Sequence, residues 1–288
     1  MELDPRYRDT IEAGRRLNIS RLIRIVLVAA ASAYLTIVAT VYFRQEALLF
    51  NPDPARLAPN DVGIRNAEVE EIITPDGEKL VAWYTAAAPG KPTILFLHGK
   101  GGSIANRPKR YAYYTGQGYG LLFLSWRGYG GSTGTPSEPG LIADAVAAYD
   151  WLLAHGVPAS GIVAVGESLG TGIAVELAAR VPLGALALES PYVSMVEVAR
   201  SHYWWLPVGW LIKNPINAGA AIDKYPGPIL MQHGDQDETI PIAIGRALYD
   251  RARGPKQFVV IPGAGHFIYT EEVFAREIAF FDKALRRQ

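Results

Sequence analysis

Three residues that lie far apart in the chain are of the types that together make an activated serine nucleophile. Ser168 is the third residue of the run Gly-Glu-Ser-Leu-Gly at 166–170. A serine hydroxyl is a weak nucleophile until a base removes its proton, and His266 in the run PGAGHF offers an imidazole for this step. Asp237 in the run HGDQDETIP can fix the tautomer of that imidazole and stabilise its charged form. The chain order serine, acid, histidine therefore predicts acyl transfer through a Ser168–Asp237–His266 triad.

The residues around Ser168 are typical of a sharp turn between a strand and a helix. The run follows the apolar stretch IVAVG at 162–166 directly and opens a helix-like stretch at 171–180. Gly166 and Gly170 leave room where two backbone segments must approach closely. A helix that begins here also places positive potential where an oxyanion would form. We therefore predict that Ser168 is a nucleophile rather than a helix cap.

The other histidines and acidic residues occupy positions with a simpler structural use. His98 and His233 end apolar runs and precede glycines, which favours hydrogen bonds to the neighbouring backbone. Asp235 is expected to organise the turn in which it lies. Asp144 is expected on a solvated face of a helix. None of these four residues is therefore preferred as a member of the triad.

A hydrolase of this kind also needs two backbone N–H groups that stabilise the developing oxyanion. The amide of Leu169, which follows the nucleophile, is one candidate. The second should come from the loop HGKGG at 98–102, and we expect the amide of Lys100, with Gly101 as the alternative. The same loop is no phosphate-binding Walker A motif, because Ile94 occupies the position of the first glycine in that pattern.

Short apolar runs alternate with helix-like stretches from about residue 67 onward. The runs lie at 94–98, 121–125, 162–166, 185–189, 229–233 and 258–262, and they are apolar almost throughout, as strands covered on both faces must be. Helical spacing of apolar residues is present at 141–153 and 269–286. Residues 68–74 and 80–86 flank the turn Pro-Asp-Gly and predict an antiparallel hairpin. This alternation predicts an α/β fold with a mostly parallel sheet and helices on both faces.

The composition excludes several classes of protein. The 288 residues include 28 basic and 28 acidic side chains, so no overall charge attracts nucleic acid. The segment RPKRYAYY at 107–114 mixes basic and aromatic residues but fits a helix after the first long strand, and no nucleic-acid partner is expected. The chain has no cysteine, which excludes disulfides, cysteine nucleophiles and thiolate metal sites.

Residues 25–43, IVLVAAASAYLTIVATVYF, carry no charge. At about 1.5 Å per residue a helix of this length covers roughly 28 Å, close to the hydrocarbon thickness of a bilayer. Six arginines precede it, at positions 6, 8, 15, 16, 21 and 24. This excess of positive charge predicts a single-pass signal anchor with residues 1–24 in the cytoplasm and the catalytic domain on the other side, periplasmic in a bacterium.

Two other interpretations of this segment remain open. A cleaved signal peptide is compatible with the small residues of AAASA, although the polar leader is long and the apolar run continues well past that point. A buried core helix is the other possibility, but a core helix of a soluble protein would be expected to carry a polar face, and this run has no charged residue. Residues 44–66 are then expected to form a linker rich in proline and alanine, and residues 67–288 the catalytic domain.

These features resemble the α/β-hydrolase superfamily from about residue 67 to the carboxy terminus. The runs WRGYGGSTGTPSEPGL at 126–141, ESPYVSM at 189–195 and HGDQDETIP are similar to those of the membrane-anchored serine hydrolases of the Bem46 and ABHD13/ABHD17-like group. The resemblance implies an α/β-hydrolase fold with a short lid, a triad on Ser168, Asp237 and His266, and action on esters or S-acyl thioesters. Lys100 stands where many relatives have asparagine, which leaves the role of its backbone amide intact.

The region at about 190–225 is where this fold often carries a lid, and it is rich in aromatic residues. It contains Tyr192, Tyr203, Trp204, Trp205 and Trp210. These rings are expected either to line an acyl pocket or meet a membrane surface, or to pack within a small lid.

The resemblance and the triad together predict one function and leave two alternatives. We expect a membrane-anchored serine hydrolase that cleaves acyl esters or thioesters of a small-molecule or lipid-like substrate through an acyl-enzyme. No metal or organic cofactor is expected. A serine peptidase or amidase would use the same triad, but the lid shows no acidic cluster for a peptide amino terminus. A non-catalytic, membrane-tethered binding module is expected to have a broken triad, whereas all three residue types are present.

Overall fold

The computed structural model describes residues 5–286, with side chains described from residue 18 onward. The chain divides into two compact units, with the boundary between Gln45 and Glu46. The first unit is helical, and the second contains the sheet and all the predicted site residues.

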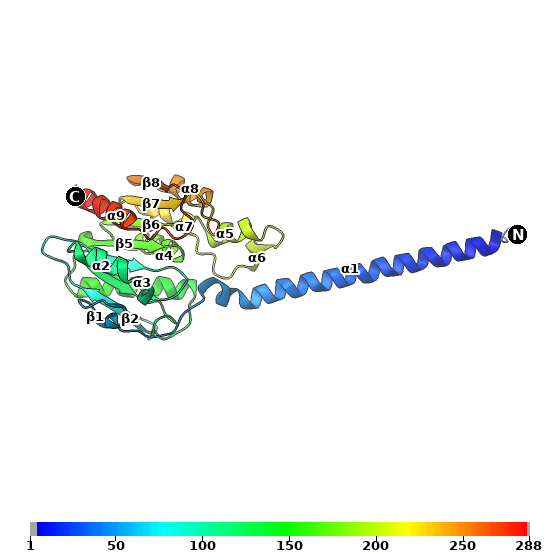
Figure 1. Cartoon of the computed structure of the whole chain (residues 1–288), viewed down its shortest axis with the longest axis horizontal. Helices are drawn as coiled ribbons and strands as arrows, with labels where there is room; N and C mark the ends of the chain where they lie inside the picture. The colour runs from blue at the N-terminus through cyan, green and yellow to red at the C-terminus, as the bar shows by residue number, and fades with distance from the viewer. Residues whose placement is uncertain (1–4, 287–288) are drawn as a thin grey trace. The chain divides into compact units, whose positions relative to one another are not determined.

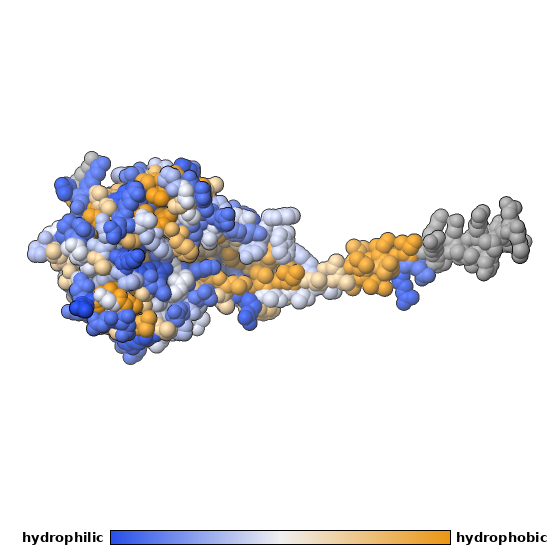
Figure 2. Space-filling model, in the orientation of Figure 1, coloured by the Kyte–Doolittle hydropathy of each residue, from blue (hydrophilic) through white to orange (hydrophobic). Residues whose placement is uncertain are grey.

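Helix α1 (Pro5–Phe50) is apolar over much of its length. The stretch Asn18–Phe50 is long and apolar enough to cross a membrane, and none of its most apolar 18-residue window is buried. Figures 1 and 2 show this helix and the band of apolar residues along it. The exposure of that window argues against the buried core helix, because a core helix hides its apolar side chains. A membrane span and a signal sequence both fit the observed helix.

The second unit contains a sheet of eight strands in the order β1-β2-β4-β3-β5-β6-β7-β8. The pairs β1·β2 and β2·β4 are antiparallel, and every other pair is parallel. The strands from β3 to β7 are buried along their whole length, as their apolar sequences require. The eight strands are β1 Glu68–Ile73, β2 Lys79–Thr85, β3 Thr93–Leu97, β4 Gly120–Leu124, β5 Ile162–Glu167, β6 Ala185–Glu189, β7 Ile229–Gly234 and β8 Lys256–Ile261. This arrangement confirms the predicted α/β fold and its amino-terminal hairpin.

Helices cover both faces of the sheet (Figure 1). One hydrophobic cluster contains side chains of α2 (Pro108–Gly116) and α9 (Glu271–Leu285), and these helices pack against each other and against the sheet. The cluster on the opposite face contains side chains of α3 (Glu138–Ala154), α4 (Leu169–Ala178) and α8 (Ile242–Arg251). Three short helices, α5 (Met195–His202), α6 (Val208–Leu211) and α7 (Ala218–Ala221), follow β6. They lie within the stretch that the sequence assigns to a lid.

Part of the segment expected to be a linker, residues 44–66, has contacts within the second unit. Helix α1 continues to Phe50, whose side chain is buried in the main hydrophobic cluster. The Tyr129 hydroxyl donates to the carbonyl of Phe50, and the Gly130 N–H donates to that of Asp53 at 2.8 Å. Ile64 is buried in the second cluster. Proline and alanine content predicted a linker, and apolar side chains and backbone hydrogen bonds connect residues 50–64 to the rest of the second unit.

The parallel strands β3 to β8 all end at the same edge of the sheet. The loops after β3, β5, β6, β7 and β8 therefore emerge side by side. These loops begin at or just before His98, Ser168, Ser190, Asp235 and Pro262. The topology thus brings the predicted nucleophile, acid, base and oxyanion loop to one edge.

Candidate active site

Ser168 occupies a strained turn between β5 and α4. Its backbone angles are φ 49° and ψ −116°, outside the regions that non-glycine residues normally adopt. A Cβ on Gly166 would lie 2.7 Å from both the Gly170 carbonyl oxygen and the Thr171 Cα. A Cβ on Gly170 would collide with the carbonyl oxygen of Leu97. The two glycines thus permit the close approach of strand and helix that the sequence predicted, and the turn has the geometry of a nucleophile elbow.

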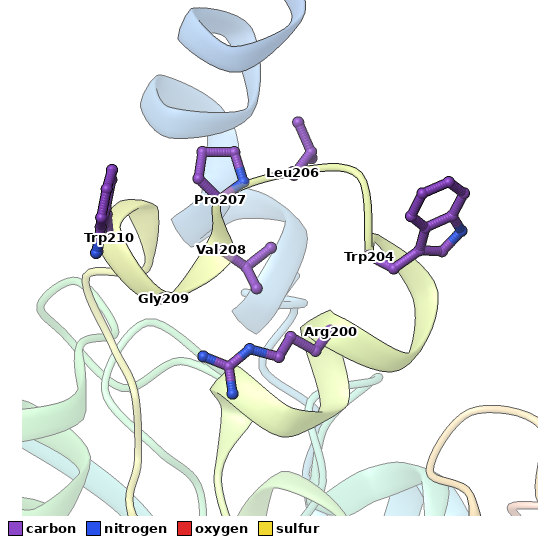
Figure 3. A pocket seen from close by; sticks show the side chains of 7 residues that line it. All are labelled: Arg200, Trp204, Leu206, Pro207, Val208, Gly209 and Trp210. Atoms are coloured by element: carbon purple, nitrogen blue, oxygen red, sulfur yellow. The ribbon is translucent and has the colours of Figure 1, made fainter.

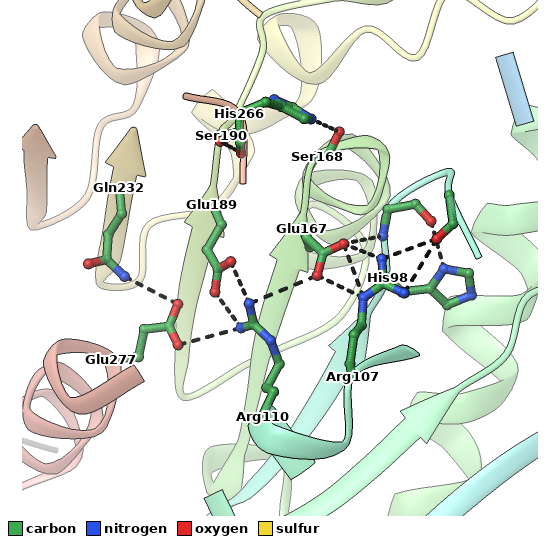
Figure 4. Close-up of polar contacts among 12 residues, drawn as sticks. His98, Arg107, Arg110, Glu167, Ser168, Glu189, Ser190, Gln232, His266 and Glu277 are labelled. Atoms are coloured by element: carbon green, nitrogen blue, oxygen red, sulfur yellow. Dashed lines mark hydrogen bonds and ion pairs between the residues drawn. The ribbon is translucent and has the colours of Figure 1, made fainter. Parts of the chain in front are cut away.

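The three predicted triad residues form a continuous hydrogen-bonded chain. His266 Nε2 lies 2.9 Å from Ser168 Oγ, a contact drawn in Figure 4. His266 Nδ1 lies 2.9 Å from Asp237 Oδ2. When Nδ1 carries the proton and donates to the carboxylate, Nε2 is free to accept the serine proton. The arrangement can therefore move a proton from the serine hydroxyl to the imidazole.

Asp237 is buried and held by several donors besides His266. Its Oδ1 accepts from the N–H groups of Thr239 and Ile240 at 2.9 and 2.8 Å, and His233 Nε2 lies 3.2 Å from Oδ2. Burial by itself would raise the pKa of this carboxyl, but the hydrogen bonds from His233, His266 and Ile240 lower it well below its usual range. Asp237 is therefore ionised at neutral pH and fixed in orientation.

The other four histidines each bond to a backbone carbonyl, as expected for His98 and His233. The acceptors are Gly99 for His98, Trp151 for His155, Thr239 for His202 and Ile240 for His233. Burial lowers the pKa of His98 to about 3, so that imidazole is neutral. None of these four histidines contacts Ser168, which leaves His266 as its partner among the described residues.

The sequence analysis predicted the environment of Asp235 correctly and that of Asp144 incorrectly. Asp235 Oδ1 accepts from the Gly263 N–H at 2.7 Å, so it does organise the turn. Asp144 was expected on a solvated face, and this expectation is wrong. Its carboxylate is fully buried and accepts from the Arg127 N–H at 2.9 Å and from Arg127 Nε at 2.8 Å. The charge on Asp144 is tolerated inside the protein because Arg127 pairs with it.

The two predicted oxyanion donors belong to segments that contact Ser168. Leu169 is the first residue of α4, so its N–H is one of the donors that a helix start leaves without an intrahelical partner. The 98–102 loop packs directly on the elbow, since a Cβ on Gly99 would lie 3.4 Å from Ser168 Cβ. Lys100 follows Gly99, and its exposed side chain points its Nζ toward the Leu48 carbonyl oxygen, 3.5 Å away. Both amides thus come from segments in contact with the nucleophile.

A buried network of charges beneath the triad was missed by the sequence analysis. Arg107 pairs with Glu167, and Arg110 pairs with Glu189 and lies near Glu277 (Figure 4). Burial would raise the pKa of Glu167, but the Arg107 and Arg110 guanidiniums lower it to about 2. A signal was present in the sequence, because two apolar runs lead into the same dipeptide, Glu-Ser, at 167–168 and 189–190.

Among the side chains that the structure describes, no three histidine, aspartate or glutamate residues are grouped so as to hold a metal ion.

The lid region presents aromatic side chains to the outside. Trp204 and Trp210 are 82% and 92% exposed, whereas Tyr192 is buried and donates to the Leu169 carbonyl oxygen at 3.0 Å. A hollow of about 390 Å³ lies here, and Figure 3 shows its lining side chains: Arg200, Trp204, Leu206, Pro207, Val208, Gly209 and Trp210. This lining contains no triad residue. The two indoles therefore do not pack inside the lid.

Comparisons with known proteins agree with this geometry. A family model of the α/β-hydrolase fold matches residues 92–219. An uncharacterized protein of Mycobacterium tuberculosis strain H37Rv is 35% identical over 235 residues, which cover 80% of this chain and 83% of that protein. The lysophosphatidylserine lipase ABHD12 of Rattus norvegicus is 34% identical over 197 residues, covering 61% of this chain and 49% of the lipase. The crystal structure of the Pyrococcus furiosus esterase Pf2001 superimposes with a TM-score of 0.67 at 22% identity, over 81% of this chain and 98% of the esterase.

The chain belongs to the α/β-hydrolase family, and the predicted fold class is confirmed. It is accordingly a hydrolase. The match to the rat lipase spans about half the length of that protein. The finer placement in the Bem46 and ABHD13/ABHD17-like group stays a prediction.

Proposed function

We propose that this protein is a membrane-anchored serine hydrolase that cleaves acyl esters or thioesters of lipid-like substrates. The observation that carries the proposal is the chain of contacts from Ser168 Oγ through His266 to Asp237, with both distances at 2.9 Å. A serine, an imidazole and an ionised carboxylate in this order form the arrangement that activates a hydroxyl for attack on a carbonyl.

In the proposed mechanism His266 removes the proton of Ser168 as Oγ attacks the acyl carbonyl carbon. The carbonyl electron pair moves to oxygen, and the amides of Leu169 and Lys100 stabilise this oxyanion. When the tetrahedral intermediate collapses, the bond to the alkoxide or thiolate breaks, and the leaving group takes the proton from His266. Water then attacks the acyl-enzyme with His266 again as base. The products are a carboxylic acid and an alcohol or thiol, and Ser168 is regenerated.

The electrostatics of the site support this assignment of roles. The low pKa of Asp237 keeps a negative charge beside His266 and stabilises the imidazolium that forms in each half-reaction. Ser168 precedes the first turn of α4, and the partial positive charge at that helix terminus favours an oxyanion nearby. The strained backbone at Ser168 holds its Oγ toward the imidazole rather than along the helix.

The substrate class is inferred from the relatives and from the surface of the chain. One relative acts as a lysophosphatidylserine lipase, and a protein of the same fold is an esterase. The apolar helix α1 and the exposed indoles of the lid suit an enzyme that meets lipids. These features favour an ester with an apolar acyl chain over a peptide.

A fluorophosphonate probe tests the nucleophile, because it modifies only an activated serine. The full chain in detergent should be labelled, whereas Ser168→Ala should not. Ser194→Ala serves as the control, since Ser194 Oγ accepts from the Glu197 N–H at 3.2 Å at the start of α5. Ser194→Ala should still be labelled, at Ser168. Equal labelling of wild type and Ser168→Ala would refute the assignment. Hydrolysis of p-nitrophenyl acyl esters and of aminoacyl amides by the same samples then separates an esterase from a peptidase.

The topology has a separate test. We propose that residues 1–24 lie in the cytoplasm and that α1 remains as an anchor, because arginines are concentrated before the apolar stretch. Alkaline phosphatase fused after Gln288 should be active in a bacterial host, and green fluorescent protein at the same place should be dark. The opposite pattern contradicts the orientation. A mature protein that starts after the AAASA run, as measured by mass spectrometry, would indicate a cleaved signal peptide.

A further inference from the structure

The strands β5 and β6 end in the same way. Each closes with a glutamate and is followed by a serine at positive φ, 49° for Ser168 and 50° for Ser190. The two glutamates, Glu167 and Glu189, are partners in the register of the parallel pair. Both carboxylates are buried, and each is held by an arginine at or near the start of α2. The sheet edge therefore carries two matched buried ion pairs, one beside the proposed nucleophile and one a strand away.

The two ion pairs differ in what else they contact. Glu189 accepts from both terminal nitrogens of Arg110, at 2.7 Å for Nη2, inside the domain. Glu167 instead accepts from the Gly99 N–H at 3.2 Å, in the loop proposed to form the oxyanion hole. Its partner Arg107 donates from Nε to Glu167 Oε2 at 2.9 Å.

Arg107 also reaches the far end of the same loop. Its Nη1 donates to the Ser103 carbonyl oxygen at 2.8 Å and to that of Gly101 at 3.4 Å. Lys100 thus lies between Gly99, which is bonded to Glu167, and Gly101, which is bonded to Arg107. One member of this ion pair, Glu167, is also the residue that directly precedes Ser168 in the chain.

The loop needs such support. Residues 99, 101 and 102 are glycines, which have more backbone freedom than any other residue, and no helix or strand includes them. An oxyanion donor accelerates the reaction only when it is already in place before charge develops. A two-point arginine–carboxylate contact has a fixed geometry and is stronger than a neutral hydrogen bond. Since the pKa of Glu167 is lowered to about 2, the pair stays charged at working pH.

We propose that Arg107 and Glu167 are positioning residues that hold the 99–103 loop so that the Lys100 amide faces the oxyanion formed at Ser168. This proposal rests on the proposed serine-hydrolase function. Neither side chain acts on the substrate itself. Their effect is exerted through the backbone of the loop, and the adjoining ion pair, Arg110–Glu189, provides an internal comparison of similar burial, although Arg110 Nη2 also lies 3.9 Å from Glu167 Oε2.

The decisive experiment compares Glu167→Gln with Glu189→Gln in the full chain. Each change removes one buried carboxylate charge that faces an arginine, so both are expected to lower the melting temperature. Active sites are counted with a fluorophosphonate, and kcat and KM for a p-nitrophenyl ester are expressed per active site. Glu167→Gln should lower kcat about 10- to 100-fold with KM within about threefold, because only transition-state stabilisation is lost. Glu189→Gln should keep kcat per site within about threefold, as its carboxylate has no bond to the loop.

A transition-state analogue provides a second readout that a purely structural role would not move. A trifluoromethyl ketone forms a tetrahedral anion on the serine, so its inhibition constant should weaken for Glu167→Gln in parallel with kcat/KM. Arg107→Lys keeps the charge opposite Glu167 but loses the two-nitrogen contact with Glu167 and the Nη1 bond to the Ser103 carbonyl oxygen, and it should retain more activity than Arg107→Gln. If Glu167→Gln fails to fold, the comparison of Arg107→Lys with Arg107→Gln still tests the positioning role.

The outcomes separate the two proposals. Equal losses of kcat per site in Glu167→Gln and Glu189→Gln, or no loss in Glu167→Gln, overturn the positioning role while leaving the hydrolase intact. A wild-type protein that neither binds the probe nor hydrolyses any ester, with Ser168→Ala indistinguishable from it, overturns the proposed function itself. The positioning role is supported if kcat per site falls in Glu167→Gln but not in Glu189→Gln, and if Arg107→Lys has a higher kcat than Arg107→Gln.

Discussion

The sheet edge around Ser168 and the lid around α5 and α6 differ in how far their functional side chains are buried and held in place. At the sheet edge Ser168, Asp237 and His266 are buried or partly buried and hydrogen-bonded to one another, and the backbone at Ser168 is strained. In the lid, Trp204 and Trp210 present most of their surface to the outside. Chemistry requires groups that are already in position before the reaction begins. Recognition of an apolar chain requires only apolar surface that the substrate can cover. The two regions should therefore respond differently to substitution.

The largest expected effect is at the acid of the triad. Asp237→Asn should lower kcat about 10⁴-fold with little change in KM, the size of loss known for the equivalent change in a serine protease. The amide would stabilise the wrong tautomer of His266, leaving a proton on the nitrogen that must accept one from Ser168. Steady-state kinetics with a short acyl ester provide the measurement. Asp235→Asn is the control, because Asp235 only accepts from the Gly263 N–H in a turn. A comparable loss of kcat in the control would contradict the distinction.

The second effect concerns packing at the elbow. Gly170→Ala should destabilise the fold by about 3 kcal/mol or more, because the new methyl group would overlap the Leu97 carbonyl oxygen. Urea denaturation of the full chain in detergent measures this loss. Gly116→Ala is the matched helical glycine, since nothing lies within 4 Å of its added Cβ. It should be neutral or stabilising by up to about 1 kcal/mol. Equal stabilities of the two variants would show that β5 and α4 can separate without cost.

A third effect is a pH dependence in the buried charge network. Burial and the nearby Glu189 raise the pKa of Glu277 well above its usual range, so the folded protein keeps this carboxyl protonated. The unfolded chain releases the proton above about pH 4.3, and wild-type stability is therefore lost as pH rises toward the folded pKa. Glu277→Gln mimics the protonated form and is free of this cost.

The stability advantage of Glu277→Gln should accordingly grow steadily between pH 5 and pH 8. Thermal unfolding of both proteins across that range measures it. The Gln232 amide, which donates to Glu277 Oε1 at 3.3 Å, can still donate to the new side chain. An advantage that stays constant with pH would mean that Glu277 is ionised in the folded protein.

The smallest expected effect is at the lid. Trp204→Ala and Trp210→Ala should change the free energy of unfolding by less than about 0.5 kcal/mol, because both side chains are exposed. If the rings cover the acyl chain, KM for a long-chain ester should rise about three- to tenfold, whereas a butyrate ester should be hydrolysed normally. Leu153→Ala, an exposed apolar residue on α3, is the control. Equal effects on long and short esters would indicate that the indoles do not meet the acyl chain.

Much of the fold was predictable because it depends on short-range properties of the chain. Continuous apolar runs such as 162–166 and 185–189 can be buried only as central strands, and both became strands of the parallel sheet. The elbow was predictable for a similar reason, since only glycine fits beside Leu97 and Thr171. The contacts among Ser168, Asp237 and His266 followed from the rule that parallel strands end at one edge of a sheet.

The pattern of residues was a poor guide where a contact with a distant part of the chain buries a side chain. Asp144 has the spacing of an exposed helix position, yet Arg127 brings it inside. Phe50 belongs to a stretch that resembles a linker, but side chains of the main hydrophobic cluster bury it. In both cases the partner lies 17 or more residues away, 127 to 144 and 50 to 129, so no local pattern reveals the contact.

The amino-acid sequence by itself determined the order of strands and helices, the strained turn at Ser168 and the types of residue available for chemistry, since these depend on local sterics and on the spacing of apolar side chains. Only the tertiary structure decided which charges meet. Glu167 faces Arg107, 60 positions away, because β5 lies beside β3 in the sheet and the loop after β3 leads into α2. Strand order and packing create such pairs, and a buried charge is stable only where that packing supplies its counterpart.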